Sequence, residues 1–264
     1  MALMVEWMAH GAVQRNPGLV LHGLDDVRLL KGAVLHDDRP EALTVSVGRA
    51  AREWGVFRVL VELGGATQGG RSVTHARGVV ILGDREAVAA ETPLPTGFPA
   101  YDRTVRSVYH DVLFHGPLLQ GIERVEGLGD AGLSAVVKTQ SDPTAWVHRP
   151  LRQGWLVDPL ALDCAFQLLS LWCFERAGAP SLPTRVGHYR QYLREFPAGR
   201  VRVTARVQRP SEHRATADFL FLDEAGRPVA RLDGYECVID ASLAQAFRRN
   251  RLTRHPAQAA PGPR

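Results

Sequence analysis

Residues 157–169 read VDPLALDCAFQLL, and this stretch decides the predicted fold. Asp158 is a good helix N-cap, because its carboxylate can accept hydrogen bonds from the first free backbone N–H groups. Pro159 follows in the first turn, where the missing N–H of proline costs nothing. From Pro159 to about Arg176 almost every side chain is apolar. A helix that is apolar on all sides needs other structure around it, so we expect a buried central helix.

Asp163 is the one acidic residue in the apolar part of this helix, and Gln167 follows four residues later. Residues at this spacing share a helix face, so the two side chains can form a hydrogen bond. Burial favours the protonated form of a carboxyl group, which makes a buried aspartic acid a usable general acid near neutral pH. From spacing alone, a solvated aspartate on an exposed stripe is the commoner arrangement.

A second apolar helix is predicted at residues 2–14, and Asn16-Pro17-Gly18 ends it. Three strand-like stretches follow, with alternating or continuous apolar residues. They cover residues 43–47, 56–63 and 72–82. The first part of the chain therefore predicts one buried helix followed by several strands.

The same order recurs after a Pro-rich connector at residues 94–102. The helix at 159–176 is accompanied by strand signals at residues 132–137, 200–207, 217–222 and 229–239. We therefore predict an α+β fold with two units, residues 1–93 and 103–245, each a buried helix with an antiparallel sheet around it. Residues 246–264 are basic and rich in Pro and Ala, which predicts a disordered tail.

Composition narrows the classes of function. The formal net charge is +4, and much of the excess lies in the arginines of the tail. No aromatic-rich basic face accompanies this charge, so nucleic-acid binding is not expected. No apolar run is long enough to span a membrane, and the first residues lack the basic start of a signal peptide. The three cysteines show no metal-binding spacing, which predicts buried, reduced thiols and a cytoplasmic location.

Several segments resemble, in the same order, the dehydratase domains of polyketide synthases. LDCAFQ at 162–167 is similar to the helical Asp-x-x-x-Gln motif of that family, and YHDVLFHGPLLQ at 109–120 looks like its Tyr-x-x-Leu-Phe-His-Gly-Pro-x-Phe-Gln segment. LPTRVG at 182–187, DEAGRPVARLDG at 223–234 and the opening ALMVEWMAHGA extend the likeness to about residue 245. Asp158 replaces the His that usually precedes the helix motif, and Leu119 replaces an aromatic residue.

The resemblance implies a double hotdog, in which two antiparallel sheets each wrap a long central helix. It also implies elimination of water from a 3-hydroxyacyl thioester carried on the phosphopantetheine of an acyl carrier protein, with no metal or organic cofactor. The acyl carrier protein and neighbouring synthase domains would be the partners, and two copies could pair. Asp163 would be the acid and Gln167 would orient it. The substrate channel would be shaped by Tyr109, Gly116, Pro117, Leu162 and Phe166.

The base is where the sequence departs most from the family. The family's catalytic histidine stands in a His-x-x-x-Gly-x-x-x-x-Pro motif before the first central helix, and residues 1–264 do not contain that motif. The resemblance therefore predicts an N-terminally truncated domain that is nearly inactive as given. His10, four residues after Glu6, and His75 are interpreted as structural, and so is His115.

The sequence is also compatible with two other functions. A catalytically silent double hotdog could serve as a scaffold or bind acyl chains. The same fold could also support thioester hydrolysis or guided cyclisation, as in product-template domains, because a fold alone does not set a function.

Overall fold

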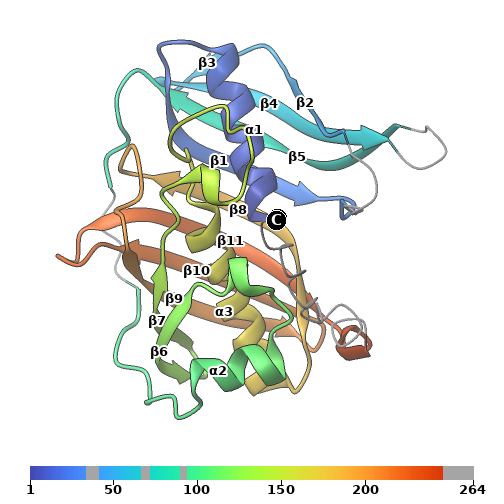
Figure 1. The fold of residues 1–264 in the computed structure, drawn as a ribbon, viewed down its shortest axis with the longest axis vertical. Helices are drawn as coiled ribbons and strands as arrows, with labels where there is room; N and C mark the ends of the chain where they lie inside the picture. Colours follow the sequence, from blue (N-terminus) through green and yellow to red (C-terminus); the bar gives the residue numbers. More distant parts are fainter. Residues whose placement is uncertain (34–41, 67–71, 90–93, 246–264) are drawn as a thin grey trace, which may run out of the picture.

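The computed structural model describes residues 1–33, 42–66, 72–89 and 94–245 (Figure 1). Along the chain its elements are α1 (Ala2–Arg15), β1 (Val20–Leu29), β2 (Thr44–Val47), β3 (Ala51–Glu53), β4 (Val56–Ala66), β5 (Ser72–Gly83), α2 (Val105–Ser107), η1 (Val108–Val112), η2 (Pro117–Leu119), β6 (Ile122–Gly129), β7 (Gly132–Lys138), η3 (Pro143–Ala145), α3 (Pro159–Ala177), β8 (Ser181–Gln191), β9 (Arg200–Ser211), β10 (Arg214–Leu222) and β11 (Pro228–Ile239).

Helix α3 is the core of the second unit. All fifteen residues from Pro159 to Cys173 are buried, as its apolar sequence predicts. Asp158 caps the helix by accepting hydrogen bonds from the N–H groups of Leu160 and Ala161. Gly178 ends it in the left-handed conformation, with φ at 69°, a conformation that costs glycine little.

Six antiparallel strands wrap α3 in the order β8-β11-β10-β9-β7-β6. Their inward side chains meet the helix, and one example is the stack of Phe166 on Tyr235, with ring centroids 4.6 Å apart. Burying an aromatic or large aliphatic side chain contributes roughly 1.5–3 kcal/mol, so this shared core dominates the stability of the second unit. The three cysteines are buried free thiols.

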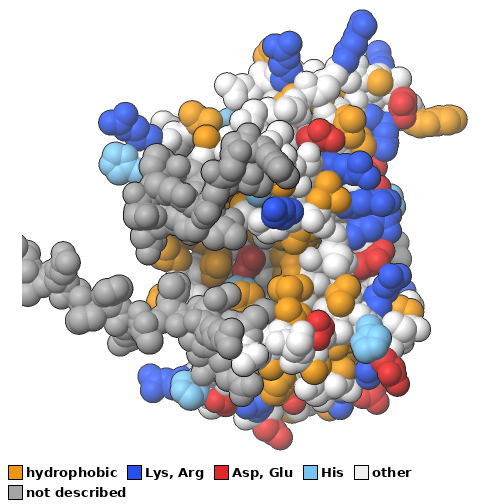
Figure 2. Space-filling view, turned by 90° about the vertical axis from the view of Figure 1, so that its right-hand side faces the viewer, with side chains coloured by type: hydrophobic (Ala, Val, Ile, Leu, Met, Phe, Trp, Pro, Cys, Tyr) orange, Lys and Arg blue, Asp and Glu red, His pale blue; other side chains and the backbone are white. Residues whose placement is uncertain are grey.

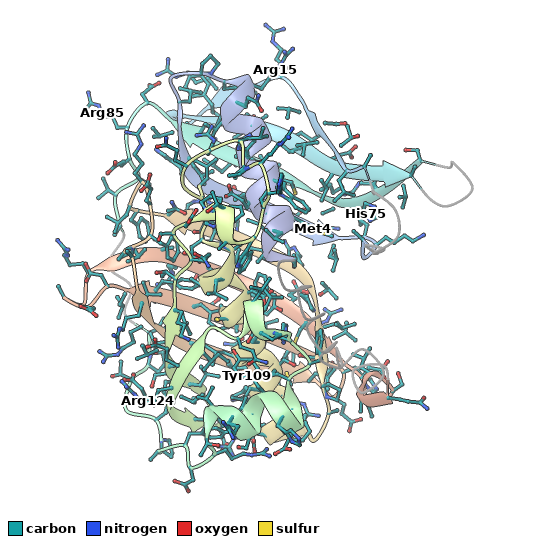
Figure 3. The ribbon with its side chains drawn as sticks, in the orientation of Figure 1. Met4, Arg15, His75, Arg85, Tyr109 and Arg124 are labelled. Atoms are coloured by element: carbon teal, nitrogen blue, oxygen red, sulfur yellow. The ribbon has the colours of Figure 1, made fainter. Side chains whose placement is uncertain are left out.

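Helix α1 has the same place in the first unit, against the strands β2-β4-β5-β1. Met8, Ala9 and Ala12 are completely buried on it. Figure 3 shows that Met4 lies towards the end of α1 that faces the second unit, whereas Arg15 lies at the far end. The start of α1 is therefore directed at the region around α3.

The two units share one continuous sheet, where the sequence predicts two separate sheets. Strand β1 pairs with β8, so that the eleven strands of the described residues form a single antiparallel sheet. Gly23 makes this approach possible: a Cβ at this position would lie 1.8 Å from the carbonyl oxygen of Tyr189. No sequence pattern indicates this contact, because the β1 segment itself is not among the predicted strands.

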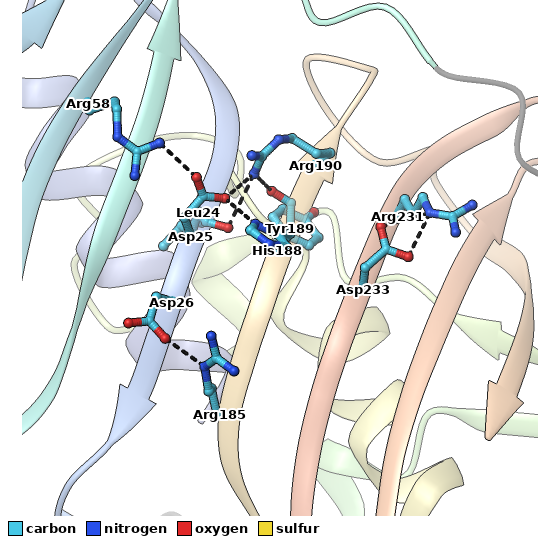
Figure 4. Close-up of polar contacts among 10 residues, drawn as sticks. All are labelled: Leu24, Asp25, Asp26, Arg58, Arg185, His188, Tyr189, Arg190, Arg231 and Asp233. Carbon is cyan, nitrogen blue, oxygen red and sulfur yellow. Dashed lines mark hydrogen bonds and ion pairs between the residues drawn. The ribbon is translucent and has the colours of Figure 1, made fainter. Parts of the chain in front are cut away.

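An ion-pair cluster centred on Asp25 crosses this seam (Figure 4). Its carboxylate contacts Arg58 at 2.9 Å, His188 at 2.9 Å and Arg190 at 2.6 Å. Burial opposes ionisation of Asp25, but the hydrogen bonds from Arg190, His188 and Arg58 outweigh it and hold its pKa below the usual value. A second ion pair, Asp26 with Arg185 at 2.6 Å, lies on the same seam.

Helix α1 also contacts the segment before α3 through Glu6. Its carboxylate accepts hydrogen bonds from the backbone N–H groups of Leu156 and Val157, at 3.2 and 2.7 Å. His10 accepts one from Nε of Arg152. The four-residue spacing allows Glu6 and His10 to pair on one helix face, but in the structure each bonds across the interface instead.

The other predicted helices and strands match the structure to within a few residues, and the strands β1, β3, β6 and β8 are additional. His75 lies on β5, buried, with its Nδ1 3.0 Å from the carbonyl oxygen of Lys31. The predicted tail lies outside the described residues, whereas the predicted connector at residues 94–102 lies within them. Among the described helices, none has both the length and the apolar character that a bilayer crossing requires.

Candidate active site

Asp163 lies on the side of α3 that faces a short helical stretch before β6. The residue is 9% exposed, so its carboxyl group is largely shielded from water. The elements around it are η1, η2 and the turn between them, which come from the chain some fifty residues earlier. The apolar neighbours on α3 indicate such burial, whereas the spacing alone favours an exposed aspartate, and the structure shows the buried arrangement.

Gln167 holds Asp163 in place. Its Nε2 donates a hydrogen bond of 2.7 Å to Oδ2 of Asp163 and another of 2.7 Å to the carbonyl oxygen of Leu119. Because Leu119 belongs to η2, the amide links the helix to the segment that covers it. The side chain is 1% exposed, so these bonds form away from water.

Tyr109 completes the chain of hydrogen bonds. Its hydroxyl donates to Oε1 of Gln167 at 2.8 Å and accepts from the backbone N–H of Ile122 at 3.0 Å. Burial raises the pKa of Tyr109, which keeps the hydroxyl protonated. Figure 3 shows Tyr109 in the second unit, in front of α3. A tyrosine, an amide and a carboxyl group therefore form one connected chain.

His115 also lies beside Asp163. Its Nε2 is 3.6 Å from Oδ2 of the carboxyl group, and its ring stacks on Phe114. Burial lowers the pKa of His115, the carboxylate of Asp163 partly opposes this, and the amino group of Met1 adds to the lowering. From the sequence we interpret His115 as structural. Its contact with Asp163 could not be predicted, because the spacing of residues along a helix gives no information about residues 115 and 163.

The other predicted site residues divide into two groups. Gly116 precedes η2 and Pro117 begins it, so both lie in the segment that covers Asp163. Leu162 is 1% exposed and Phe166 stacks on Tyr235, so both pack within the core of the second unit. The structure therefore connects Tyr109 to the carboxyl group through Gln167, places Gly116 and Pro117 next to Leu119 in the covering segment, and buries Leu162 and Phe166 in the core.

The N-terminus of α3 is already occupied. The carboxylate of Asp158 accepts hydrogen bonds from Leu160, Ala161 and also Gln140, and burial raises its pKa to about 6. These helical N–H groups are therefore not free to bind a ligand.

A cavity of about 820 Å³ lies along α1 and not at Asp163. Its lining includes Trp7, His10 and Gly11 of α1 and Val45 and Val47 of β2. Figure 2 shows, on one face of the molecule, a hollow in which hydrophobic side chains gather around an acidic one.

Residues 85–242, more than half of the chain, match the family model described as the polyketide synthase dehydratase N-terminal domain. The chain belongs to the polyketide synthase dehydratase family. This confirms the resemblance seen in the motifs. One curated relative is a polyunsaturated fatty acid synthase subunit from Thraustochytrium sp., which is 28% identical over 191 residues, or 70% of this chain. The chain spans about 7% of that protein's length.

Solved dehydratase domains show the same fold. The dehydratase domain from the CurF module of the curacin polyketide synthase is 18% identical, with a TM-score of 0.70 over 90% of this chain and 84% of that one. A trans-AT PKS dehydratase domain from Brevibacillus brevis is 18% identical, with a TM-score of 0.69 over the same shares. The double hotdog predicted from the sequence is therefore confirmed, with the two hotdogs joined through β1 and β8.

Proposed function

We propose that this dehydratase-family chain eliminates water from a 3-hydroxyacyl thioester, with Asp163 as the general acid. The observation that carries the proposal is the carboxyl group itself, buried on α3 and held by Gln167 at 2.7 Å. A carboxyl group held in one orientation and shielded from water can pass its proton to a leaving hydroxyl. Gln167 and Tyr109 orient it through their hydrogen-bond chain.

The elimination transfers two protons. A base removes a proton from C2 of the acyl chain, and the electron pair of that C–H bond forms the C2–C3 double bond. The C3–O bond breaks, and the departing oxygen takes the proton of Asp163 and leaves as water. Negative charge develops on the thioester oxygen on the way, and donors aimed at it lower the barrier.

The substrate would arrive on the phosphopantetheine arm of an acyl carrier protein, within a larger synthase. The curated relative, a much longer synthase polypeptide of which this chain spans about 7%, supports this setting. The reaction needs no metal ion and no organic cofactor besides that arm. A homodimer and a cytoplasmic location are part of the same proposal.

The test is turnover of a 3-hydroxyacyl N-acetylcysteamine thioester by the purified chain, with the enoyl product followed by mass spectrometry. Asp163→Asn should abolish the product while circular dichroism stays unchanged. Asp130→Asn is the matched control, because the Asp130 side chain is 94% exposed. Normal dehydration by the Asp163→Asn variant would contradict the acid role.

A second candidate function is binding of an acyl chain without turnover. The cavity along α1, with apolar walls from β2, favours it. Saturable binding of the thioester by a chain that forms no enoyl product would support this candidate over the first.

A further inference from the structure

Tyr109 lies on η1, a helical stretch of only five residues. Its hydroxyl bonds Gln167, and Gln167 in turn holds the carboxyl group of Asp163. A helix this short is not stable by itself, because its few hydrogen bonds do not offset the entropy lost in forming the first turn. The position of Tyr109 therefore depends on the contacts that hold η1 against the rest of the second unit.

The inner side of η1 is held by apolar packing. Val108 and Val112 are both buried, and the N–H of Leu113 bonds the carbonyl oxygen of Val108 to close the wide helical turn. Burial of apolar surface is not directional, so it presses η1 against the core without fixing how the stretch is rotated or shifted along α3. A directional contact is needed to fix the place of its side chains.

Arg103 supplies a directional contact from the outer side. Its Nη2 donates a hydrogen bond of 2.9 Å to Oδ2 of Asp111 on η1. Its Nη1 donates one of 3.1 Å to Oε1 of Glu175 on α3, the helix that also carries Gln167 and Asp163. The guanidinium is a rigid planar fork, so the two bonds together set the distance and the orientation between η1 and α3.

The bridge formed by Asp111, Arg103 and Glu175 is half-exposed. The three side chains are 43%, 34% and 25% exposed. Solvent therefore screens both ion pairs, and their contribution to the stability of the fold is small. A small displacement of a group in an active site, in contrast, can lower a rate about 100-fold. A bridge that positions η1 should therefore affect the site much more than it affects stability.

We propose that Arg103 is a positioning residue, which fixes the place of Tyr109 and through it the orientation of Asp163. The inference rests on the proposed elimination. Among the described residues Arg103 has no bond to Tyr109 or to Asp163, so it acts through η1. Its contact with Asp111 sets η1, and η1 carries the tyrosine that bonds Gln167.

Two control variants follow from the same contacts. The hydroxyl of Tyr101 also bonds Glu175, at 2.7 Å, but it has no hydrogen bond to η1 in the part of the chain that the structure describes. Tyr101→Phe therefore removes a bond to the same carboxylate and leaves the bridge in place. Arg124→Gln removes another exposed arginine of the second unit, one that pairs with Glu126 on β6.

Hydrogen exchange measured by NMR tests the placement of Tyr109 without any need for turnover. The N–H of Ile122 donates to the Tyr109 hydroxyl, so its protection reports where that hydroxyl lies. We expect Arg103→Gln and Asp111→Asn to lower this protection roughly fivefold, as the weakening of one hydrogen bond does. The N–H of Ala161, which bonds Asp158, should keep its protection. The two control variants should leave both amides as in the wild type.

Kinetics test the consequence for the proposed acid. For dehydration of a 3-hydroxyacyl N-acetylcysteamine thioester, Arg103→Gln should lower kcat about tenfold and change KM little. Arg103→Lys keeps the charge but lacks the planar fork, so its kcat should lie between the two. In the Tyr109→Phe background, Arg103→Gln should cause little further loss, because the side chain that it positions no longer bonds Gln167.

Unchanged protection of Ile122 in both Arg103→Gln and Asp111→Asn would overturn the proposal. An equal loss at Ile122 and Ala161 would also overturn it, because that result indicates a general loosening of the fold. The same holds for a full tenfold loss of kcat in the Tyr109→Phe background. Selective loss of protection at Ile122, in a chain that dehydrates no 3-hydroxyacyl thioester, would uphold the bridge and overturn the proposed function.

Discussion

Asp163 is bonded to Gln167 on the same helix, and Tyr109 connects that amide to the segment before β6. Its hydroxyl satisfies both the N–H of Ile122 and the amide oxygen of Gln167. Since a buried polar group left without a partner costs about 1–3 kcal/mol, this one hydroxyl stabilises both the fold and the orientation of the acid.

The Tyr109→Phe variant tests whether the hydroxyl of Tyr109 contributes both to stability and to the orientation of Asp163. We expect the free energy of unfolding in urea to fall by about 1–3 kcal/mol, because two buried groups lose a partner. Dehydration should slow while the KM for the thioester changes little. Tyr101→Phe is a control hydroxyl deletion, since that hydroxyl bonds Glu175 outside the site. A Tyr109→Phe variant as stable as the wild type would refute the shared role.

At the scale of single residues the sequence predicts part of the site. The four-residue spacing on α3 predicts the Asp163–Gln167 contact, because helix geometry is local. The contacts of His115 and Leu119 with that helix depend on how η1 and η2 fold back over it, which no local pattern records. The roles assigned to the site residues stay predictions.

Among the elements, α3 depends most on its cap. Asp158 accepts three backbone hydrogen bonds, two from the first turn of α3 and one from Gln140 on a neighbouring segment. Loss of an N-cap costs about 0.5–2 kcal/mol, and the N–H groups here are buried as well.

Asp158→Ala is therefore expected to lower the free energy of unfolding by about 2 kcal/mol or more, measured by urea denaturation. Asp142→Ala provides the comparison, because Asp142 caps the short η3 and is exposed. Equal losses in the two variants would contradict the dependence of α3 on its buried cap.

Glu6 connects α1 to the segment before α3 and makes the stability depend on pH. Burial, the largest effect, raises its pKa from 4.5 to about 7, although the bonds from Val157 and Leu156 oppose this. The folded chain therefore holds a proton that the unfolded chain releases between these values. The contribution of Glu6 to the free energy of unfolding is therefore greatest below pH 4.5 and falls as the pH rises to about 7.

Glu6→Gln should remove this part of the pH dependence of the free energy of unfolding. By linkage, the total change that Glu6 contributes between its unfolded and folded pKa values is about 3 kcal/mol. The measurement is the free energy of unfolding at about pH 5 and about pH 8, with the exposed Glu224→Gln as control. A slope that persists in Glu6→Gln would rule out this carboxyl group as its source.

At the scale of the whole molecule, the Asp25 cluster joins the two hotdogs. The pKa of Asp25 is lowered, so its stabilising contribution is present above the usual aspartate range and is lost as the pH falls below it. Because Arg58 and Arg190 are about one third exposed, solvent screens the pairs and reduces their contribution.

Asp25→Asn should lower the free energy of unfolding by about 1–3 kcal/mol. In this variant, hydrogen exchange should show a larger loss of protection for the amides of α1 than for those of α3. The reason is that the smaller unit loses ion pairs that join it to the larger one. Equal loss of protection in both helices would indicate that backbone pairing between β1 and β8 suffices.

The sequence predicts the two helices and most strands, since apolar periodicity is a local signal. It does not predict the single sheet, because the pairing of β1 with β8 joins segments more than 150 residues apart. Gly23 and Asp25 both contact β8, and no sequence pattern around either residue indicates this contact.

That shared sheet has a consequence for engineering hybrid synthases. Exchanging one hotdog for that of a relative would set foreign side chains opposite Gly23, Asp25 and Asp26, where close approach and charge must both match. Crossovers placed between the two halves should therefore yield insoluble chimeras, whereas transplanting both halves together preserves every strand's neighbour.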